Sequence, residues 1–384
     1  MGVGAGVALR RGNVLPSVRI PPADAVGPVV FLKTTVVSVE SGWGMGVKHI
    51  GVVAWCVGIA ACIGLTAWSG IGDVGTAAAS VGAGMPLVVL TRVATVSIAG
   101  IGWWLLLPAG ELLRLRAAVL IRFIRESVNT LMPLTQVGGD IVGARLATFW
   151  RVPGPLAAAS VIVDVLMQAA TQFLFAAMGL ATLVALGANA AVAGIAATGL
   201  ALAIPMLGGF YLAQRGGGHR IIRFLLDRLQ GDSNWGLLGS VDAAYRCMSA
   251  IYAHRSGLLA SSVVHMIGWL VGVLEVYIAL GWMGHPVTIG EALVIESLVQ
   301  AVRGAAFVIP SALGAQEAGL ILLCGIFAIP PDQALALSVI KRAADLVVGV
   351  PGLAALQFLE GGRLTGDNSR SEEQPSLDLQ SESR

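Results

Sequence analysis

The stretches LMPLTQVGGD, residues 131–140, and VIPSALGAQE, residues 308–317, decide the fold of this chain. Each interrupts an apolar run with a proline, then glycine, then an acid that lies seven residues after the proline. Proline and glycine end or kink a helix. Arginines precede both prolines, at Arg122 and Arg125 in the first copy and at Arg303 in the second. We therefore interpret the two stretches as copies of one unit in which a helix breaks and resumes.

The composition places these breaks in a membrane protein. Of 384 residues, 56% are hydrophobic and 12% are charged, whereas soluble domains contain about 25% charged residues. With 24 basic and 22 acidic residues the chain cannot form a polar shell in water. The predicted fold class is an all-α polytopic membrane protein. Its net charge of +2 gives no basic excess for a nucleic-acid partner.

Apolar runs of about 20 residues predict the full spans. We expect about six of them, together with two broken segments at about 123–146 and 291–329. The six runs are residues 50–69, 86–107, 155–186, 188–213, 257–283 and 334–359.

The distribution of Lys and Arg predicts the orientation, because these residues stay in cytoplasmic loops. Residues 112–125 and 214–255 are rich in arginine, whereas residues 70–85, 187–189 and 284–290 contain no Lys or Arg. Both termini are thus expected on the cytoplasmic side. The first broken segment should then enter from inside and the second from outside. Two oppositely oriented re-entrant hairpins in an inverted repeat are typical of transporters with a site near the midplane; chance similarity of two kinks would also explain the pattern.

Three regions follow from these patterns. Residues 1–46 lack the apolar core and cleavage site of a signal peptide and are predicted to be a disordered cytoplasmic segment. Residues 47–359 form a single transmembrane domain. Residues 360–384 are charged and rich in serine, which predicts a disordered cytoplasmic tail.

Ionisable residues within the apolar segments indicate a shared polar cavity. At about 2.5–3.5 kcal/mol for each charge facing lipid, nine such groups would cost about 25 kcal/mol. We expect the broken helices to line a hydrated cavity that collects them. Six acids against three bases favour a neutral or cationic ligand over a phosphate. The groups are Asp140, Asp164, Glu275, Glu296, Arg303, Glu317, Lys341, Arg342 and Asp345, besides His265.

Some of these groups could instead have purely structural partners. Lys341 and Asp345 are four residues apart and could neutralise one another on a helix. Arg92 lies near the outer end of its helix and could extend to the membrane surface. Arg145 or Arg151 could also neutralise Asp164, and Glu275 and His265 could each have a separate hydrogen-bonding partner.

Motifs for catalysis or cofactor binding are not found. The sequence has no HExxH, no phosphate-binding GxxxxGK[ST] and no Ser/His/Asp order with supporting glycines. Its five histidines are scattered, and its four cysteines have neither zinc spacing nor the pattern of a disulfide framework. We predict that the chain is not an enzyme and has no catalytic residues, cofactor or metal.

Several motifs resemble the bacterial flippase-like family, also called the lysylphosphatidylglycerol synthase transmembrane region. In the first half these are RESVN (125–129), LMP (131–133), QVGGD (136–140), GARL (143–146) and the later Val163-Asp164. In the second half they are RGAAFVIP (303–310), GAQEAG (314–319), SVIKR (338–342) and GVPGL (349–353). The second set is most similar to hopanoid-biosynthesis-associated membrane proteins of HpnL type.

This resemblance, which covers about residues 50–359, implies a lipid translocator of the bacterial inner membrane that moves hopanoid or a related lipid. The full synthases carry a soluble aminoacyl-transferase domain after the membrane part, whereas about 25 residues follow Leu359 here; lysine transfer is therefore not expected. Expected partners are membrane lipids, hopanoid-like or phospholipid, with hopanoid-biosynthesis or export proteins and a second copy of the chain as further candidates.

The candidate substrate-binding residues lie in the breaks and on the helices around them. Their carboxylates and amides would share hydrogen bonds with head-group hydroxyls or an amine, and their cations would keep the acids ionised or bind an anionic head. Two other functions stay open: an ion- or proton-coupled transporter of a small solute, and a catalytic or non-catalytic subunit of a lipid-biosynthesis complex. The candidates are Arg122, Arg125, Asn129, Gly138, Gly139, Asp140, Asp164, Arg303, Gln316, Glu317, Lys341, Arg342 and Asp345.

Overall fold

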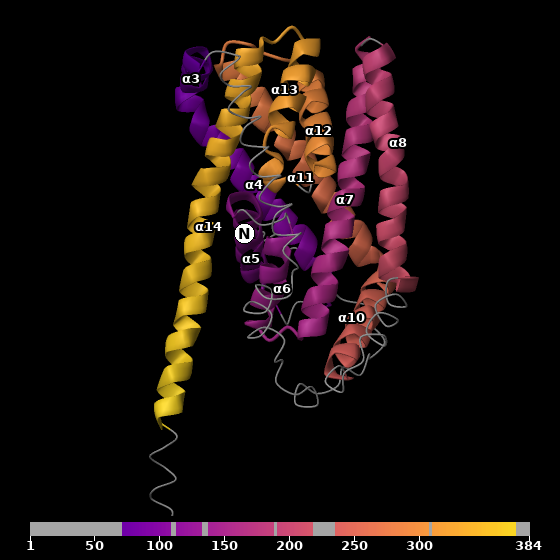
Figure 1. The fold of residues 1–384 in the computed structure, drawn as a ribbon, viewed down its shortest axis with the longest axis vertical. Helices are drawn as coiled ribbons and strands as arrows, with labels where there is room; N and C mark the ends of the chain where they lie inside the picture. The colour runs from indigo at the N-terminus through magenta and orange to yellow at the C-terminus, as the bar shows by residue number, and fades with distance from the viewer. Residues whose placement is uncertain are drawn as a thin grey trace, which may run out of the picture. The chain divides into compact units, whose positions relative to one another are not determined.

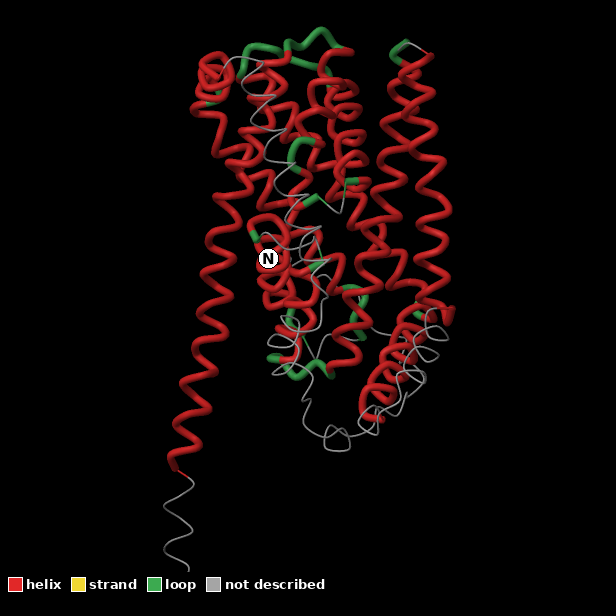
Figure 2. The backbone as a smooth tube through the Cα atoms, in the orientation of Figure 1, coloured by secondary structure: helices red, strands yellow, loops and turns green. Residues whose placement is uncertain are grey.

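The computed structural model describes residues 71–108, 113–132, 137–187, 190–217, 235–306 and 309–373. These residues all belong to one compact unit, His49–Arg384. Within them the chain forms helices and turns and contains no strand (Figures 1 and 2). Four predicted features lie outside the described residues: the segment 1–46, the span at 50–69, Pro133, and residues 374–384.

The described residues form long apolar helices and several shorter ones. In the first half they are α3 (Ile71–Ser80), the 3-10 turn η2 (Gly82–Gly84), α4 (Met85–Trp104), α5 (Leu115–Leu131), α6 (Gly138–Thr148) and α7 (Gly154–Ala185). In the second half they are α8 (Ala190–Leu212), the π-helical turn η3 (Ala213–Gly217), α10 (Trp235–Ala253), α11 (Arg255–Trp282), α12 (Ile289–Ala305), the 3-10 turn η4 (Pro310–Ala312), α13 (Ala315–Ile326) and α14 (Pro331–Glu373).

Four of the six predicted spans are confirmed as helices long and apolar enough to cross a membrane. They are Gly82–Trp104, Gly154–Ala185, Ala193–Arg215 and Arg255–Trp282. The span predicted at 334–359 lies within α14, which continues past Leu359, where the tail is predicted to begin, to Glu373.

Each broken segment consists of two short helices that pack on one another, α5 with α6 and α12 with α13. These helices have 17, 11, 17 and 12 residues, fewer than the roughly 20 that a bilayer requires. Figure 1 shows α5 and α6 toward one end of the bundle and α12 and α13 toward the other. The re-entrant course of the two hairpins stays a prediction.

The two breaks contact each other. Ser311 Oγ, in η4, donates a hydrogen bond of 2.6 Å to the carbonyl oxygen of Thr130 near the end of α5. Ser311 and Ala312 have φ of 52° and 49°, so the backbone of η4 is in the left-handed region, which non-glycine residues rarely adopt. The turn therefore joins the second hairpin to the first at the position where α5 ends.

Each hairpin has its own apolar core. Buried Ile295, Leu298 and Leu320 of α12 and α13 pack in one cluster with α11 and α14. Buried Ile121 and Leu146 of α5 and α6 pack in another with α4 and α7.

Candidate functional site

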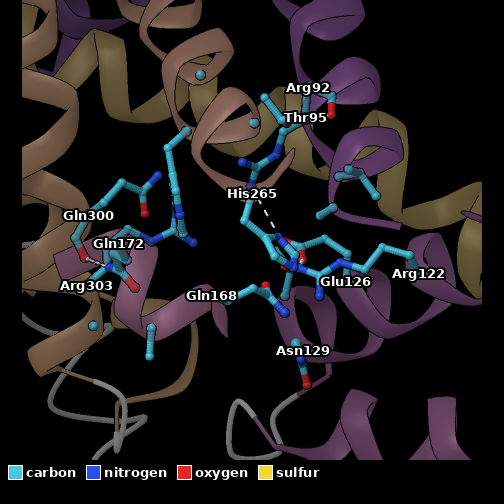
Figure 3. Close-up of a pocket in the computed structure, with 18 of the residues that line it drawn as sticks. Arg92, Thr95, Arg122, Glu126, Asn129, Gln168, Gln172, His265, Gln300 and Arg303 are labelled. Atoms are coloured by element: carbon cyan, nitrogen blue, oxygen red, sulfur yellow. Dashed lines mark hydrogen bonds and ion pairs between the residues drawn. The ribbon is translucent and has the colours of Figure 1, made fainter. Parts of the chain in front are cut away.

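A cavity of about 310 Å³ lies within the helix bundle. It is lined by parts of α4, α5, α6, α7, α11 and α12, together with Ser311 of η4 (Figure 3). Its lining is rich in charge and in side-chain amides, which in a membrane protein face protein or water rather than lipid. The polar residues include Arg92, Arg122, Glu126, Asn129, Asp140, Gln168, Gln172, His265, Glu275, Glu296, Gln300 and Arg303.

Arg125 is the centre of a first ion-pair cluster. Its side chain is 1% exposed, and its Nη2 and Nε lie 2.6 Å and 3.0 Å from Asp140 Oδ1. Its Nη1 lies 2.9 Å from Asp164 Oδ2. The guanidinium also lies over the ring of Trp103, 5.3 Å from the centroid, within the range of a cation–π interaction. One arginine thus holds α5, α6 and α7 together.

Glycines in α6 allow this close approach. A Cβ at Gly143 would lie 2.5 Å from Arg125 Cδ, and a Cβ at Gly139 would overlap the carbonyl oxygen of Arg125. The Gly139 N–H instead donates a hydrogen bond of 2.7 Å to Asn129 Oδ1. Gly138, at the start of α6, precedes it. Gly139 and Gly143 are therefore needed for packing against α5, and none of the three glycines lines the cavity.

Asp164 is fully buried and has four neighbouring donors. His265 Nε2 lies 3.0 Å from its Oδ1, and Gln168 Nε2 donates a hydrogen bond of 2.8 Å to its Oδ2. Arg125 and the more distant Arg122, at 3.7 Å, complete the set. The suggested pairing with Arg145 or Arg151 is wrong, because Asp164 is buried among α5 and α11 partners. Arg145 instead pairs with Glu360 at 3.3 Å, where both side chains are more than a third exposed.

Arg92 and Asp345 extend this first cluster. Arg92 forms an ion pair with Asp345 of α14 and lies 3.8 Å from Glu126, which also pairs with Arg122 at 3.2 Å. Arg92 is 11% exposed and lines the cavity, so the expectation that it extends to the membrane surface is wrong. Asp345 also does not pair with Lys341, because α14 turns the acid toward α4 and the lysine toward α11 and α12.

A second ion-pair cluster consists of Lys341, Glu275 and Glu296. Lys341 Nζ lies 2.9 Å from Glu296 Oε2 and 3.4 Å from Glu275 Oε2. Gln300 Nε2 donates a hydrogen bond of 2.8 Å to Glu296 Oε1. Glu275 Oε1 is buried and has no hydrogen-bond partner among the described residues. Two carboxylates therefore share one ammonium group at the cavity wall.

Glu317 lies apart from the cavity. Arg342 Nη2 and Nε lie 2.6 Å and 2.9 Å from its Oε1, and Ser338 Oγ donates a hydrogen bond of 2.8 Å to the same oxygen. The Gly314 N–H donates a hydrogen bond of 2.7 Å to Oε2, so the side chain caps its own helix. Gln316 Nε2 joins the group through Ser338 Oγ at 3.1 Å.

The structure thus divides the predicted site residues into groups. Arg122, Asn129, Asp140 and Arg303 line the cavity. Arg125, Asp164, Lys341 and Asp345 hold cavity residues through ion pairs. Gln316, Glu317 and Arg342 form a separate group, Gly139 fits α6 against α5, and Gly138 is the first residue of α6.

Several lining residues were not among the candidates. Gln168 and Gln172 follow Asp164 at intervals of four, so all three share one face of an apolar helix. Glu296 and Gln300 repeat this spacing on α12. A polar stripe at helical spacing would have identified these amides, whereas counting charges alone does not. The others are Arg92, Glu126, His265 and Glu275.

The described residues contain no group of three or more His, Cys, Asp or Glu that could hold a metal ion.

A family model described as the lysylphosphatidylglycerol synthase TM region matches residues 54–352. This range contains both hairpins and every residue that lines the cavity. No curated protein and no solved structure matches the chain.

Proposed function

The chain belongs to the family of the lysylphosphatidylglycerol synthase TM region, and from that premise we propose that it translocates an amphipathic lipid across the bacterial inner membrane. Hopanoid or a related lipid is the substrate that the sequence motifs suggest. The observation that supports translocation most directly is the cavity of about 310 Å³, in which charged and amide side chains gather inside a bundle of apolar helices.

The size and lining of the cavity suit a lipid head group. Ligand sites for small molecules occupy about 300–1,000 Å³, so about 310 Å³ can hold a head but not a whole lipid. Moving a polar group through hydrocarbon without hydrogen bonds costs several kcal/mol. The carboxylates and amides of the lining would replace the lost water while the apolar body of the lipid stays in the bilayer.

The contact between the two breaks supports a route through this cavity. Ser311 and Asp140 belong to different hairpins, and both line the cavity. In transporters built from inverted repeats, movement of one repeat against the other exposes the site to each side in turn. Movement of the hairpins about the Ser311 to Thr130 contact would expose the cavity in the same way.

We further propose that the chain transfers lipid without modifying it, with both termini in the cytoplasm and with lipid-biosynthesis or export proteins as partners.

A second candidate function is proton-coupled transport of a small solute. It is favoured by the buried pair of His265 and Asp164, at 3.0 Å, since buried His and Asp groups form proton relays in pumps and transporters.

Reconstitution of the full chain in vesicles tests the proposal. We expect exchange of tail-labelled fluorescent lipid between leaflets and no new lipid species by chromatography. Asp140→Asn should slow the exchange, while Arg116→Gln, which changes an exposed arginine on the same hairpin, should not. A modified lipid would indicate a biosynthetic subunit instead, and solute uptake without lipid exchange would indicate the secondary transporter.

A further inference from the structure

We infer that the cavity selects a zwitterionic head, with an anionic group bound by Arg303 and a cationic group bound by Glu275. The inference rests on the proposed function, since it takes this cavity to be the place where the head crosses. It concerns two charged side chains of the cavity lining: Glu275, whose buried Oε1 has no hydrogen-bond partner among the described residues, and Arg303, which forms no ion pair with any of them.

The negative end is at the second ion-pair cluster. Glu296 uses both oxygens, one with Lys341 and the other with Gln300. Glu275 has only the longer contact of 3.4 Å to the same lysine, and its Oε1 has no partner in the described part of the chain. Two carboxylates share this ammonium group, and the guanidinium of Arg92 also attracts Glu275. A ligand ammonium could donate the hydrogen bond that Glu275 Oε1 lacks.

The positive end is Arg303. Throughout the described ranges, no carboxylate oxygen lies within 4.0 Å of its guanidinium and no hydrogen bond involves its side chain. By contrast, Arg92, Arg122 and Arg125 all have acidic partners. A guanidinium presents five donors in a fixed planar arrangement that matches a phosphate or a carboxylate. Arg303 attracts Glu126 and Glu296 only at longer range, so its guanidinium N–H groups are available to an anionic ligand group.

The two ends are separated by a distance that one head group can span. Arg303 follows Glu296 by seven residues on α12, a rise of about 10 Å, and Glu275 is at the level of Glu296 because both contact Lys341 Nζ. The flexible arginine side chain can reduce this separation. Figure 3 shows Arg303 on the same side of the cavity as Gln172 and Gln300, whose amides provide neutral hydrogen-bonding groups next to the positive end.

The observed ion pairs change the ligand charge that the numbers of acids and bases had suggested. Six acids against three bases favoured a neutral or cationic ligand, but those numbers left out three bases, Arg92, Arg122 and Arg125, and one acid, Glu126. In the first cluster every carboxylate has an arginine or His265 within 4.0 Å. An uncharged polyol would leave Arg303 without an ion pair and Glu275 Oε1 without a hydrogen-bond donor. An amine joined to a phosphodiester by a short linker satisfies both, so this inference favours such a head over the uncharged head of a hopanoid.

Leaflet exchange in vesicles tests this inference with four tail-labelled lipids that differ only in the head: ethanolamine phosphate, glycerol phosphate, a quaternary ammonium without phosphate, and an uncharged sugar. We expect the ethanolamine head to exchange at least about tenfold faster than the others, the factor that corresponds to about 1.4 kcal/mol. Glu275→Gln should reduce the ethanolamine rate to that of glycerol phosphate. Arg303→Gln should reduce the rates of both phosphate-containing heads.

Within one variant, the ratio of the exchange rates of two lipids does not depend on how much of the protein is folded. A destabilised variant therefore remains informative. Glu275→Asp and Arg303→Lys keep the charges and should retain part of the preference. Arg116→Gln and Glu360→Gln, at exposed or half-exposed positions outside the cavity, should retain all of it.

Uptake of labelled glycerophosphoethanolamine distinguishes a soluble zwitterion from a lipid. Uptake without lipid exchange would support the zwitterionic site but overturn lipid translocation. Lipid exchange that is indifferent to the head would overturn the zwitterionic site and leave translocation standing. Failure of both exchange and uptake would overturn both.

Discussion

Asp140 and Glu317 occupy matching positions in the two hairpins but have different surroundings. Each lies seven residues after a proline and in the first turn of a short helix. Asp140 is 16% exposed, lines the cavity and pairs with Arg125 of the preceding helix. Glu317 is 3% exposed, lies away from the cavity lining and pairs with Arg342 of the following helix.

The difference shows that a sequence repeat fixes the position of an acid on its helix but not its partner. Arg303 is the counterpart of Arg125 in the sequence, yet it does not pair with Glu317, because Arg342 of α14 occupies that acid. This leaves Arg303 available in the cavity. The first hairpin therefore contributes a paired acid to the site, and the second contributes an unpaired base.

The largest expected effect is on stability, at the two arginines. Arg125→Gln should lower the free energy of unfolding by about 3–5 kcal/mol, because it leaves Asp140 and Asp164 without their strongest partner at a buried position. Arg342→Gln should cost less, because Arg342 is 25% exposed. Thermal unfolding of the purified variants measures both. Equal losses would show that the two hairpins depend on their ion pairs equally.

The second effect is on transport, at the two acids. Asp140→Asn weakens a charge-assisted hydrogen bond worth about 1.5–3 kcal/mol at the cavity and should slow lipid exchange by about tenfold or more. Glu317→Gln should reduce the amount of folded protein but leave the exchange rate per folded molecule nearly unchanged. Exchange in vesicles, normalised to folded protein, separates the two. A larger loss of rate in the Glu317 variant would reverse the assignment of roles.

The third effect is on packing, at one glycine in each hairpin. Gly143→Ala should destabilise the protein by about 1–3 kcal/mol, because the new Cβ would lie 2.5 Å from Arg125 Cδ. At Gly319 the nearest atom would be 3.4 Å away, on the Val302 side chain. Gly319→Ala should therefore be neutral or stabilising, by up to about 1 kcal/mol, because alanine favours helix. Chemical denaturation of both variants checks the contrast.

The smallest effect is expected at the exposed pair of Arg145 and Glu360. Both side chains are more than a third exposed, and such pairs contribute about 0–1 kcal/mol. Arg145→Gln should leave the unfolding midpoint almost unchanged, in contrast to Arg125→Gln on the same hairpin. A large shift would indicate that α14 depends on this contact for its position against α6.

Much of the fold could be predicted from the composition and from the lengths of the apolar runs. The spans at 86–107, 155–186, 188–213 and 257–283 correspond to α4, α7, α8 and α11, because an apolar run of about 20 residues has one stable form in a bilayer. The breaks correspond to η4 and to the interval between α5 and α6. The extension of α14 beyond Leu359 was not predicted, because composition describes solvation and does not locate a helix end.

The candidate site could be predicted only in part. Charge within apolar segments made Asp140, Asp164 and Arg303 recognisable, since such groups are costly in lipid and need a shared polar cavity. Their partners were harder to infer. Lys341 and Asp345 are one turn apart on α14, yet they do not pair with each other. Lys341 pairs with acids of α11 and α12, whereas Asp345 pairs with Arg92 of α4. The uncharged Gln168, Gln172 and Gln300 were overlooked because an amide causes a much smaller hydropathy penalty than a charge.

The amino-acid sequence by itself determined a helical membrane protein, the positions of its two breaks and the presence of ionisable groups that lipid cannot accommodate. These properties follow from the transfer free energies of single residues and the stiffness of the backbone, which are local. The tertiary structure alone decided which opposite charges meet and left Glu275 and Arg303 able to bind further groups at the cavity. Ion pairing depends on distances of a few ångströms between helices far apart in sequence, and only packing sets those distances.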